Sequence, residues 1–421
     1  MKIVVIGAGV VGLGAAWRCA ARGADVTLVD PEPASGASGV AAGMLAPVSE
    51  LDYGEEALLR LGVASRNRYP EFVAELEELT GLDTAHRADG LLEVAFDADD
   101  LRVLEDVKRF QESLGVPTEV LGRRECRRLE PMLAPTVRGG LYAPQDGSID
   151  PRRLTPALLA AAEKLGARLV RRWAAEVVVR GDAAVGVRLD GGEELPADRV
   201  LLAAGPWSGD LGGIPPGVVP PVRPVKGQVL RLRLGGIPPG VVPPVRPVKG
   251  QVLRLRSRMP LLGRTVRGVV RGSSIYLVPR ADGELVVGAT QEELGFDTRV
   301  TAGGLWELLR DARELVPGVT ELDFAEAAAG LRPGSPDNAP VLGPSALPGL
   351  VLGVGHYRNG ILLAPVSADA LCAALLDGEL PEVARPFSPD RFSPGSAPRF
   401  SPGSSPGLSS ESSSEGFRTG A

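Results

Sequence analysis

The sequence predicts an α/β protein in which a Rossmann-like domain is joined to a second, α+β domain built on an antiparallel sheet. Three observations predict this class. The N-terminus has the pattern of a strand, a glycine-rich turn and a helix, and the segment 267–289 alternates like antiparallel strands. The length of 421 residues, with 44% hydrophobic content, suffices for two cores and a tail.

The N-terminal strand and turn are the strongest local signal. Ile3–Ile6 is a short β-branched apolar run, typical of a strand that is buried on both faces. Gly7, Gly9 and Gly12 follow with G-x-G-x-x-G spacing, and residues 10–21 have helix-forming composition. Glycines at this spacing let backbone N–H groups and the positive end of a helix approach a pyrophosphate. The segment therefore predicts a dinucleotide-binding site.

A second strand, 25–29, ends at Asp30. A carboxylate at the end of this strand accepts a hydrogen bond from a ribose hydroxyl, and it favours a free 2′-hydroxyl over a 2′-phosphate. FAD or NAD is therefore expected rather than NADP. The Ala-, Gly- and Ser-rich run at 31–50 would let the backbone pass close to a flat or bulky ligand.

Composition excludes several other classes of function. The net charge of −6 and a pI near 5.3 provide no basic field for nucleic acid, and no apolar segment is long enough to cross a membrane. Cys19, Cys126 and Cys372 lie far apart and lack C-x-x-C spacing, which indicates reduced thiols in a cytoplasmic protein. Because His86 and His356 are the only histidines, neither a metal site nor a Ser-His-Asp triad is expected.

The rest of the chain is predicted to mix helices and strands. The first half is expected to contain one or two amphipathic helices at 54–79, a strand at 90–96, a helix at 97–115, a turn at 139–142, a further helix and a strand at 167–171. The second half is expected to contain a hairpin of 177–179 and 184–189, a strand at 198–205, strands at 267–270, 274–279 and 284–289 with a turn at Asp282-Gly283, a helix at 302–315, a turn-rich loop at 330–340, a strand at 350–354 and a final helix after 360. Residues 386–421 are rich in Ser, Pro and Gly and are expected to form a disordered tail.

A 23-residue segment occurs twice in tandem, at 211–233 and 234–256, without a single difference. Solenoids need at least three diverged repeats that stack, so two identical copies indicate a recent duplication or a sequence error rather than an architecture. Each copy contains one candidate strand, Gln228–Arg233 or Gln251–Arg256. Only one of them can occupy a given place in a sheet, and the other is expected to bulge out or to lie alongside as an extra strand.

A set of motifs follows the glycine turn in order, up to about residue 392: AAGMLAP at 41–47, PVRPVKGQ in the duplicated segment, YLVPR at 276–280, VVGAT at 286–290, AGLRPG at 329–334 and GHYRNGILLAP at 355–365. Together they resemble the FAD-dependent glycine oxidases of thiamine biosynthesis, within the D-amino-acid oxidase group. Two features depart from the family pattern. The duplication falls in the substrate domain, and Ala328 stands where the family commonly has Trp before AGLRPG.

The resemblance implies a discontinuous FAD-binding domain formed by 1–82, 141–210 and 326–385, and a substrate domain formed by 83–140 and 211–325. It implies non-covalent FAD and the oxidation of glycine and other small amino acids to imines by hydride transfer to flavin, with O2 reduced to H2O2. The imine from glycine would feed thiazole formation through a hand-off to thiazole synthase. The resemblance leaves open whether the chain forms a homo-oligomer.

Arg332 is the expected carboxylate ligand, because a planar guanidinium can bind a carboxylate bidentately. Tyr276 would add a phenolic O–H to the same carboxylate, and Arg358 would line the site beside the flavin ring. The residues expected to contact the cofactor are Gly7, Gly9, Val10, Val11, Gly12, Asp30, Ser38, Ala42, Gly43, Met44, Val177, Gly205, His356, Tyr357, Arg358, Asn359, Gly360, Ile361 and Leu362. If the N-terminus of the final helix faces the flavin, its partial positive charge would stabilise the negative charge of the reduced ring.

Two alternatives remain open from the sequence. One is a sarcosine or D-amino-acid oxidase, or a dehydrogenase that passes electrons to a quinone. The other is a flavin-binding protein without turnover, made so by the duplication. Substrate profiling and O2 dependence would separate the enzymes, and bound flavin without H2O2 would indicate the binding protein.

Overall fold

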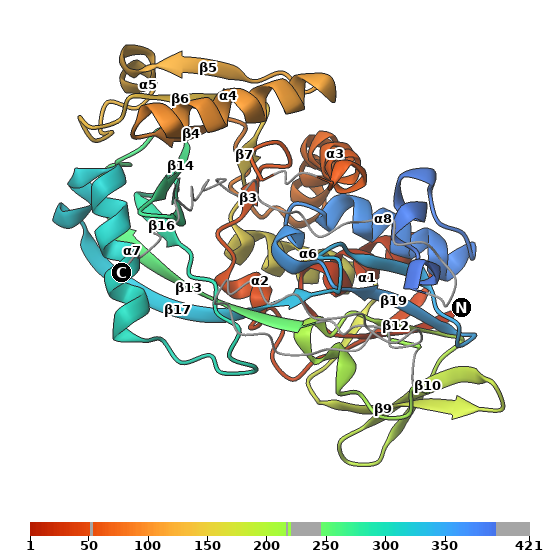
Figure 1. The fold of residues 1–421 in the computed structure, drawn as a ribbon. Helices are drawn as coiled ribbons and strands as arrows, with labels where there is room; N and C mark the ends of the chain where they lie inside the picture. The colour runs from red at the N-terminus through yellow and green to blue at the C-terminus, as the bar shows by residue number, and fades with distance from the viewer. Residues whose placement is uncertain (51–53, 216–217, 220–245, 393–421) are drawn as a thin grey trace, which may run out of the picture.

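The computed structural model describes residues 1–50, 54–215, 218–219 and 246–392. A six-stranded sheet and an eight-stranded sheet form the body of the molecule (Figure 1), and smaller sheets of three and two strands accompany them. None of the helices in the described residues is long and apolar enough to cross a membrane.

The six-stranded sheet has the order β18-β19-β12-β1-β2-β8. Its strands are β1 (Lys2–Ile6), β2 (Asp25–Val29), β8 (Arg168–Val170), β12 (Arg199–Leu202), β18 (Val341–Pro344) and β19 (Leu350–Val354). All neighbours pair in parallel except β18 with β19. A parallel sheet needs cover on both faces, and each face of this one is covered by a different layer.

The helices that cover one face are α1 (Val10–Ala21), α3 (Glu56–Thr80), α6 (Pro151–Lys164) and α8 (Ala364–Leu376). The other face packs on a meander of β9 (Ala174–Arg180), β10 (Ala183–Leu189) and β11 (Glu194–Pro196). Side chains along β1 alternate between the two faces of the sheet. Those of Ile3 and Val5 pack in the core with the helices, and those of Val4 and Ile6 pack in the core with the meander.

The eight-stranded sheet has the order β17-β13-β16-β15-β14-β4-β6-β5. Its strands are β4 (Leu91–Ala95), β5 (Glu119–Gly122), β6 (Gly139–Ala143), β13 (Arg246–Arg256), β14 (Thr265–Val270), β15 (Ser273–Pro279), β16 (Glu284–Gly288) and β17 (Asp323–Gly334). Helix α7 (Ala302–Leu315) packs on one face, and α4 (Ala98–Ser113) and α5 (Arg123–Leu129) lie at the β5 end (Figure 1). The sheet is antiparallel except where β4 meets β14.

Each predicted helix and strand that lies within the described residues is confirmed, whereas one predicted turn and part of one predicted loop are wrong. The predicted turn at 139–142 is strand β6, paired on both sides with β4 and β5. A Cβ on Gly139 or Gly140 would lie 2.7 or 2.5 Å from a neighbouring carbonyl oxygen, so these glycines allow close strand approach. The predicted loop at 330–340 is wrong over its first five residues, which continue β17 against β13.

The predicted domain boundaries at 140/141 and 325/326 fall inside β6 and β17, so two strands of one sheet cross them. The predicted tail also starts too early. The 3₁₀ segments Glu382–Phe387 and Pro389–Phe392 follow α8, the Phe387 side chain is buried, and Arg391 pairs with Asp337 at 2.8 Å. Residues 393–421 lie outside the described residues.

Strand β13 comes from the second copy of the duplicated segment and fills one place in the sheet, between β16 and β17. The candidate strand of the first copy, Gln228–Arg233, lies outside the described residues. The start of the first copy packs on the six-stranded sheet instead, where the side chains of Leu211 and Ile214 contact the meander core.

Candidate functional site

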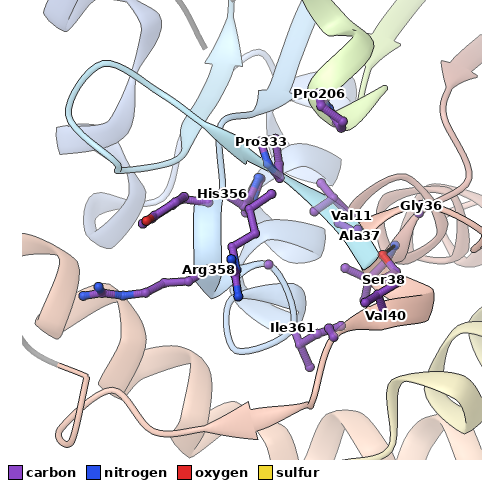
Figure 2. Close-up of a pocket in the computed structure, with 18 of the residues that line it drawn as sticks. Val11, Gly36, Ala37, Ser38, Val40, Pro206, Pro333, His356, Arg358 and Ile361 are labelled. Carbon is purple, nitrogen blue, oxygen red and sulfur yellow. Dashed lines mark hydrogen bonds between the residues drawn. The ribbon is translucent and has the colours of Figure 1, made fainter. Parts of the chain in front are cut away.

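A continuous cavity of about 1280 Å³ runs from the glycine turn after β1 to the face of the eight-stranded sheet. Figure 2 shows Val11, Ser38 and Val40 on one side of it, with Pro333 and His356 on the other. The cavity therefore joins the predicted dinucleotide site to the strands that carry the predicted substrate ligands.

The glycine turn closes one end of the cavity. Gly7 has φ +101°, and a Cβ on it would lie 2.4 Å from the carbonyl oxygen of Ala203. A Cβ on Gly12 would lie 2.0 Å from the carbonyl oxygen of Gly7. Gly9 is the N-cap of α1 and makes no side-chain cap hydrogen bond. The positive end of α1 thus faces the cavity with its backbone close to the ligand space.

Asp30 lines the same end of the cavity. Its carboxylate accepts hydrogen bonds from the backbone N–H groups of Ala8, at 2.7 Å, and Glu32, at 2.8 Å. These bonds fix the acid beside the turn, and a carboxylate has further lone pairs that remain for a ribose hydroxyl. Ser38 accepts a hydrogen bond from the N–H of Val10 at 3.0 Å, which ties the small-residue segment to α1.

The segment around Ala42 and Gly43 forms the middle of the cavity. Gly43 has φ +80°, and a Cβ there would lie 2.0 Å from the carbonyl oxygen of Ile149. Arg280 holds this region in place, because its buried guanidinium donates to the carbonyl oxygens of Ile149 and Ala42. Burial lowers the pKa of Arg280.

A second support comes from α3. Its Tyr69 hydroxyl donates to the carbonyl oxygen of Ile361, and its Ser65 hydroxyl donates to that of Leu362 at 2.7 Å. The loop that precedes α8 is thereby anchored to a buried helix face. Helix α8 begins at Ala364, with Pro365 in its first turn, and its N-cap Leu363 makes no side-chain cap hydrogen bond.

Arg332 lies at the other end of the cavity, on β17. Its guanidinium passes over Gly250 of β13, where a Cβ would lie 2.5 Å from both terminal nitrogens. One of these nitrogens donates a long hydrogen bond, 3.4 Å, to the carbonyl oxygen of Thr290. The guanidinium is therefore positioned by the backbone of β13 and of the segment after β16, and Arg332 lines the cavity.

Tyr276, on β15, lines the cavity beside Arg332. Gly288 on the adjacent strand makes room for its ring, because a Cβ there would lie 2.5 Å from the Tyr276 hydroxyl oxygen. Burial raises the pKa of Tyr276, and Arg332 opposes this through its charge and a side-chain hydrogen bond. The structure thus brings together the two predicted carboxylate ligands.

Two charged residues that the sequence did not single out lie in the same cavity. Arg267 on β14 is directly opposite Tyr276 in register, and Glu93 on β4 is directly opposite Arg267. The Nε of Arg267 lies 3.6 Å from Oε1 of Glu93. Burial raises the pKa of Glu93. No sequence signal places these three residues side by side, because their register depends on strand pairing between distant segments.

Arg358 and His356 occupy the loop before α8. Arg358 lines the cavity, but its guanidinium also donates to the carbonyl oxygen of Glu50 at 2.7 Å and lies 3.4 Å from Glu55. His356 is buried, and its Nε2 lies 3.0 Å from the Ser367 hydroxyl oxygen. Burial lowers the pKa of His356 to about 4, so the imidazole is neutral at pH 7.

Most of the residues expected at the cofactor line the cavity, but Gly12, Val177, Asn359 and Leu362 do not. Gly12 packs on the glycine turn from behind. The Val177 side chain belongs to the meander core, and its N–H donates to the carbonyl oxygen of Gly212. Asn359 and Leu362 line a separate, small cavity beside α3. Further lining residues that the sequence did not indicate are Ala34, Ser35, Gly36, Ala37, Trp173, Ala174, Pro206, Trp207, Gly250 and Gln291.

These features fit FAD. The cavity holds about 1280 Å³, with the N-terminus of α1 and an acid at one end and small residues along its middle, as a dinucleotide site requires. Glycines at positions where a Cβ would collide with backbone keep the path open. None of the three cysteines, all of which are buried, lines the cavity.

Comparison with protein families gives one match. The family model DAO, described as FAD dependent oxidoreductase, matches residues 2–241 and again 233–374. The two matches overlap within the duplicated segment, as expected if both copies correspond to one part of the model.

Individual relatives agree. The chain is 32% identical over 368 residues to a glycine oxidase of Geobacillus kaustophilus, covering 87% of this chain and 90% of that one. It is 36% identical over 376 residues to the bifunctional protein ThiO/ThiG of Nostoc sp., covering 89% of this chain and 52% of the relative. The chain thus spans about half the length of the first curated relatives that it matches.

Solved structures show the same likeness. The glycine oxidase of Geobacillus kaustophilus superposes with a TM-score of 0.80 at 30% identity, over 92% of this chain and 98% of that one. An iminodiacetate oxidase from Chelativorans sp. BNC1 gives a TM-score of 0.79 at 25% identity, with the same shares covered. The family match, the relatives and the cavity agree, and the chain therefore belongs to the DAO family of FAD-dependent oxidoreductases.

Proposed function

We propose that the chain oxidises glycine and other small amino acids to imines, with O2 as the electron acceptor and H2O2 as the second product. The observation that carries this proposal is the meeting of Arg332 and Tyr276 in one cavity with the glycine turn. A carboxylate ligand pair at one end and a dinucleotide site at the other place an amino acid against the reactive part of a flavin.

Arg332 has the central role in substrate binding. Its fork of N–H donors matches a carboxylate, and Gly250 leaves the space that the guanidinium occupies. Tyr276 supplies an O–H donor to the same carboxylate. These two residues orient the amino acid so that its Cα–H bond is presented in a fixed direction.

The chemistry that FAD would supply when bound is hydride acceptance, with reoxidation by O2 giving H2O2. The protein contributes electrostatics around it. The loop before α8, which includes Gly360 and Ile361, lines the cavity, and the partial positive charge at the N-terminus of α8 would stabilise negative charge on a reduced flavin if that end faces the ring. The neutral His356 agrees with a reaction that needs little acid–base machinery.

The cofactor is proposed to bind without a covalent link, which is supported by the absence of cysteines from the lining of the cavity among the described residues. The imine from glycine is proposed to pass to a thiazole synthase for thiamine formation. Support for this step is the likeness to bifunctional ThiO/ThiG proteins, half of whose length this chain spans.

An H2O2 assay on the purified flavoprotein with glycine, sarcosine and D-alanine tests the proposal, beside the variant Arg332→Ala. Peroxide from glycine that falls at least about 100-fold in the variant supports both the reaction and the carboxylate ligand. Peroxide from sarcosine or D-alanine alone would indicate the related oxidases instead. Bound flavin without peroxide from any of the three would overturn the proposal.

A further inference from the structure

The cavity continues past the carboxylate ligands along the eight-stranded sheet. Tyr276, Arg267 and Glu93 are register partners on the neighbouring strands β15, β14 and β4, and all three line the cavity. Register partners on one face of a sheet point to the same side. These three residues, called the polar row below, therefore extend the substrate end of the cavity by two strands.

The hydrogen-bonding capacity of the polar row is used unevenly. Arg267 donates to the carbonyl oxygen of Ser49 at 2.6 Å, and its Nε faces Glu93. The Glu93 carboxylate accepts no hydrogen bond from any residue that the structure describes, and the Arg267 Nε at 3.6 Å is beyond hydrogen-bonding distance. Its side chain is only 15% exposed. A carboxylate that is largely buried normally has donors, so Glu93 has unused acceptor positions aimed at the cavity.

The charges around Glu93 favour a cationic or donor group over a second carboxylate. Glu50 also lines this part of the cavity, and its negative charge adds to that of Glu93. The single positive charge of Arg267 neutralises only one of the two negative charges of Glu50 and Glu93. Arg358, the other cation nearby, lies beside Glu55 and donates to a backbone carbonyl. Glu93 and the two charged residues that act on it, Glu50 and Arg267, are therefore net negative when taken together.

On the basis of the proposed oxidation, we propose that Glu93 forms a second subsite, which binds the terminal ammonium of a diamino acid while Arg332 holds its α-carboxylate. Neighbouring strands lie about 4.8 Å apart, so the backbones of Tyr276 and Glu93 are roughly 10 Å apart across the sheet. An extended chain with three methylene groups spans roughly 6 Å between carboxyl carbon and terminal nitrogen. A hydrogen bond of about 2.8 Å at each end covers the remaining distance. Ornithine has this length.

The test compares DL-ornithine with DL-norvaline, which has the same carbon chain without the amine. In the unmodified flavoprotein, kcat/KM for ornithine should exceed that for norvaline about tenfold, the effect of one charge-assisted hydrogen bond. In Glu93→Gln this ratio should fall to about one, with the flavin spectrum showing that the variant is folded. Glu307→Gln, an exposed acid on α7, is the matched control and should keep the ratio.

A norvaline rate equal to or above the ornithine rate in the unmodified protein would overturn the subsite, and so would a ratio that Glu93→Gln leaves unchanged. If DL-aspartate is oxidised faster than both ornithine and norvaline, the polar row binds a second carboxylate, and the proposed ammonium subsite is overturned too. If glycine gives no H2O2, the proposed oxidation itself is wrong. In that case titration of the flavin absorbance with ornithine and norvaline tests the subsite by binding alone, with the same tenfold difference expected.

Discussion

At the scale of single residues, two glycines decide how the substrate end of the cavity is shaped. Gly250 and Gly288 lie on adjacent strands, and each leaves the space that one functional side chain occupies, Arg332 in the first case and Tyr276 in the second. A side chain at either position would displace the neighbouring functional group without touching the flavin loops. Substrate binding and cofactor binding can thus be altered separately.

We predict that Gly250→Ala impairs substrate binding while FAD stays bound. The new methyl group would lie 2.5 Å from both terminal nitrogens of Arg332, so the guanidinium must move. The KM for glycine should rise about tenfold, and Arg332→Lys, which loses the bidentate fork, should lower kcat/KM on the order of 100-fold. Steady-state peroxide assays with the flavin content as internal control measure both. An unchanged KM in Gly250→Ala would contradict this placement of Arg332.

His356 is predicted to destabilise the protein in mild acid. Burial holds its pKa at about 4, whereas an unfolded histidine titrates near 6.5. Between these values the unfolded chain binds a proton that the folded chain does not, so stability is present above pH 6.5 and falls as the pH drops towards 4. In His356→Asn the loss of unfolding free energy between pH 7 and pH 5 should be about 2 kcal/mol smaller than in the unmodified protein.

Urea unfolding at the two pH values measures this difference. Asp146 acts in the opposite sense, because burial raises its pKa to about 6, and its contribution is the same in both proteins. It therefore cancels in the comparison. If the free energy of unfolding depends on pH equally in the two proteins, His356 does not cause the loss of stability in acid.

At the scale of elements, the turn between β1 and α1 is packed so closely that it leaves no space for a methyl group on Gly12. We predict that Gly12→Ala abolishes FAD binding, because its Cβ would lie 2.0 Å from the carbonyl oxygen of Gly7 and would push α1 away from β1. Gly303→Ala, in the first turn of α7 with no atom within 4 Å of its Cβ, is the control and should keep FAD. Flavin absorbance after gel filtration separates the two outcomes, and a yellow Gly12→Ala protein would contradict the prediction.

Strands β13 and β17 show how an element can carry both fold and function. One face of β13 joins the core under α7 through Leu253 and Leu255, and the other face presents Gly250 and Val252 to the cavity. Gln251 links this strand to the N-terminus of α7, since its side chain accepts from the N–H of Thr301 at 2.8 Å. The sheet is therefore braced directly behind the substrate end of the cavity.

At the scale of the whole molecule, the described parts of the two identical copies complement each other. The first copy supplies 211–215 and 218–219, which pack on the FAD-binding side, and the second supplies β13 from Arg246 onward. Apart from the triplet Pro-Pro-Val, every position of a single copy falls within 211–219 or 246–256. The part of the fold that the structure describes therefore contains the beginning of the first copy and the end of the second.

We predict that deleting residues 211–233 leaves FAD binding and glycine oxidation within about twofold of the unmodified protein. The copies are identical, so this deletion and the deletion of 234–256 give the same chain, which still contains both used parts. Thermal unfolding and the peroxide assay measure the result. A colourless or aggregated deletion variant would show that the second copy is required for the fold.

The sequence alone determined the dinucleotide site, because its glycines, strand, helix and acid lie within thirty consecutive residues and act through local backbone geometry. It also determined the helix α7 and most strands, whose periodic patterns are local too. Arg332 and Tyr276 were predicted through motifs.

Tertiary structure alone decided the neighbours of these two residues. Gly139–Ala143 is a strand because partners on both sides complete its hydrogen bonds, although its glycines favour a turn. Glu93 meets Arg267 because β4 pairs in parallel with a strand far along the chain. Register between distant strands is set by the packing of the whole sheet, and no short stretch of sequence contains it.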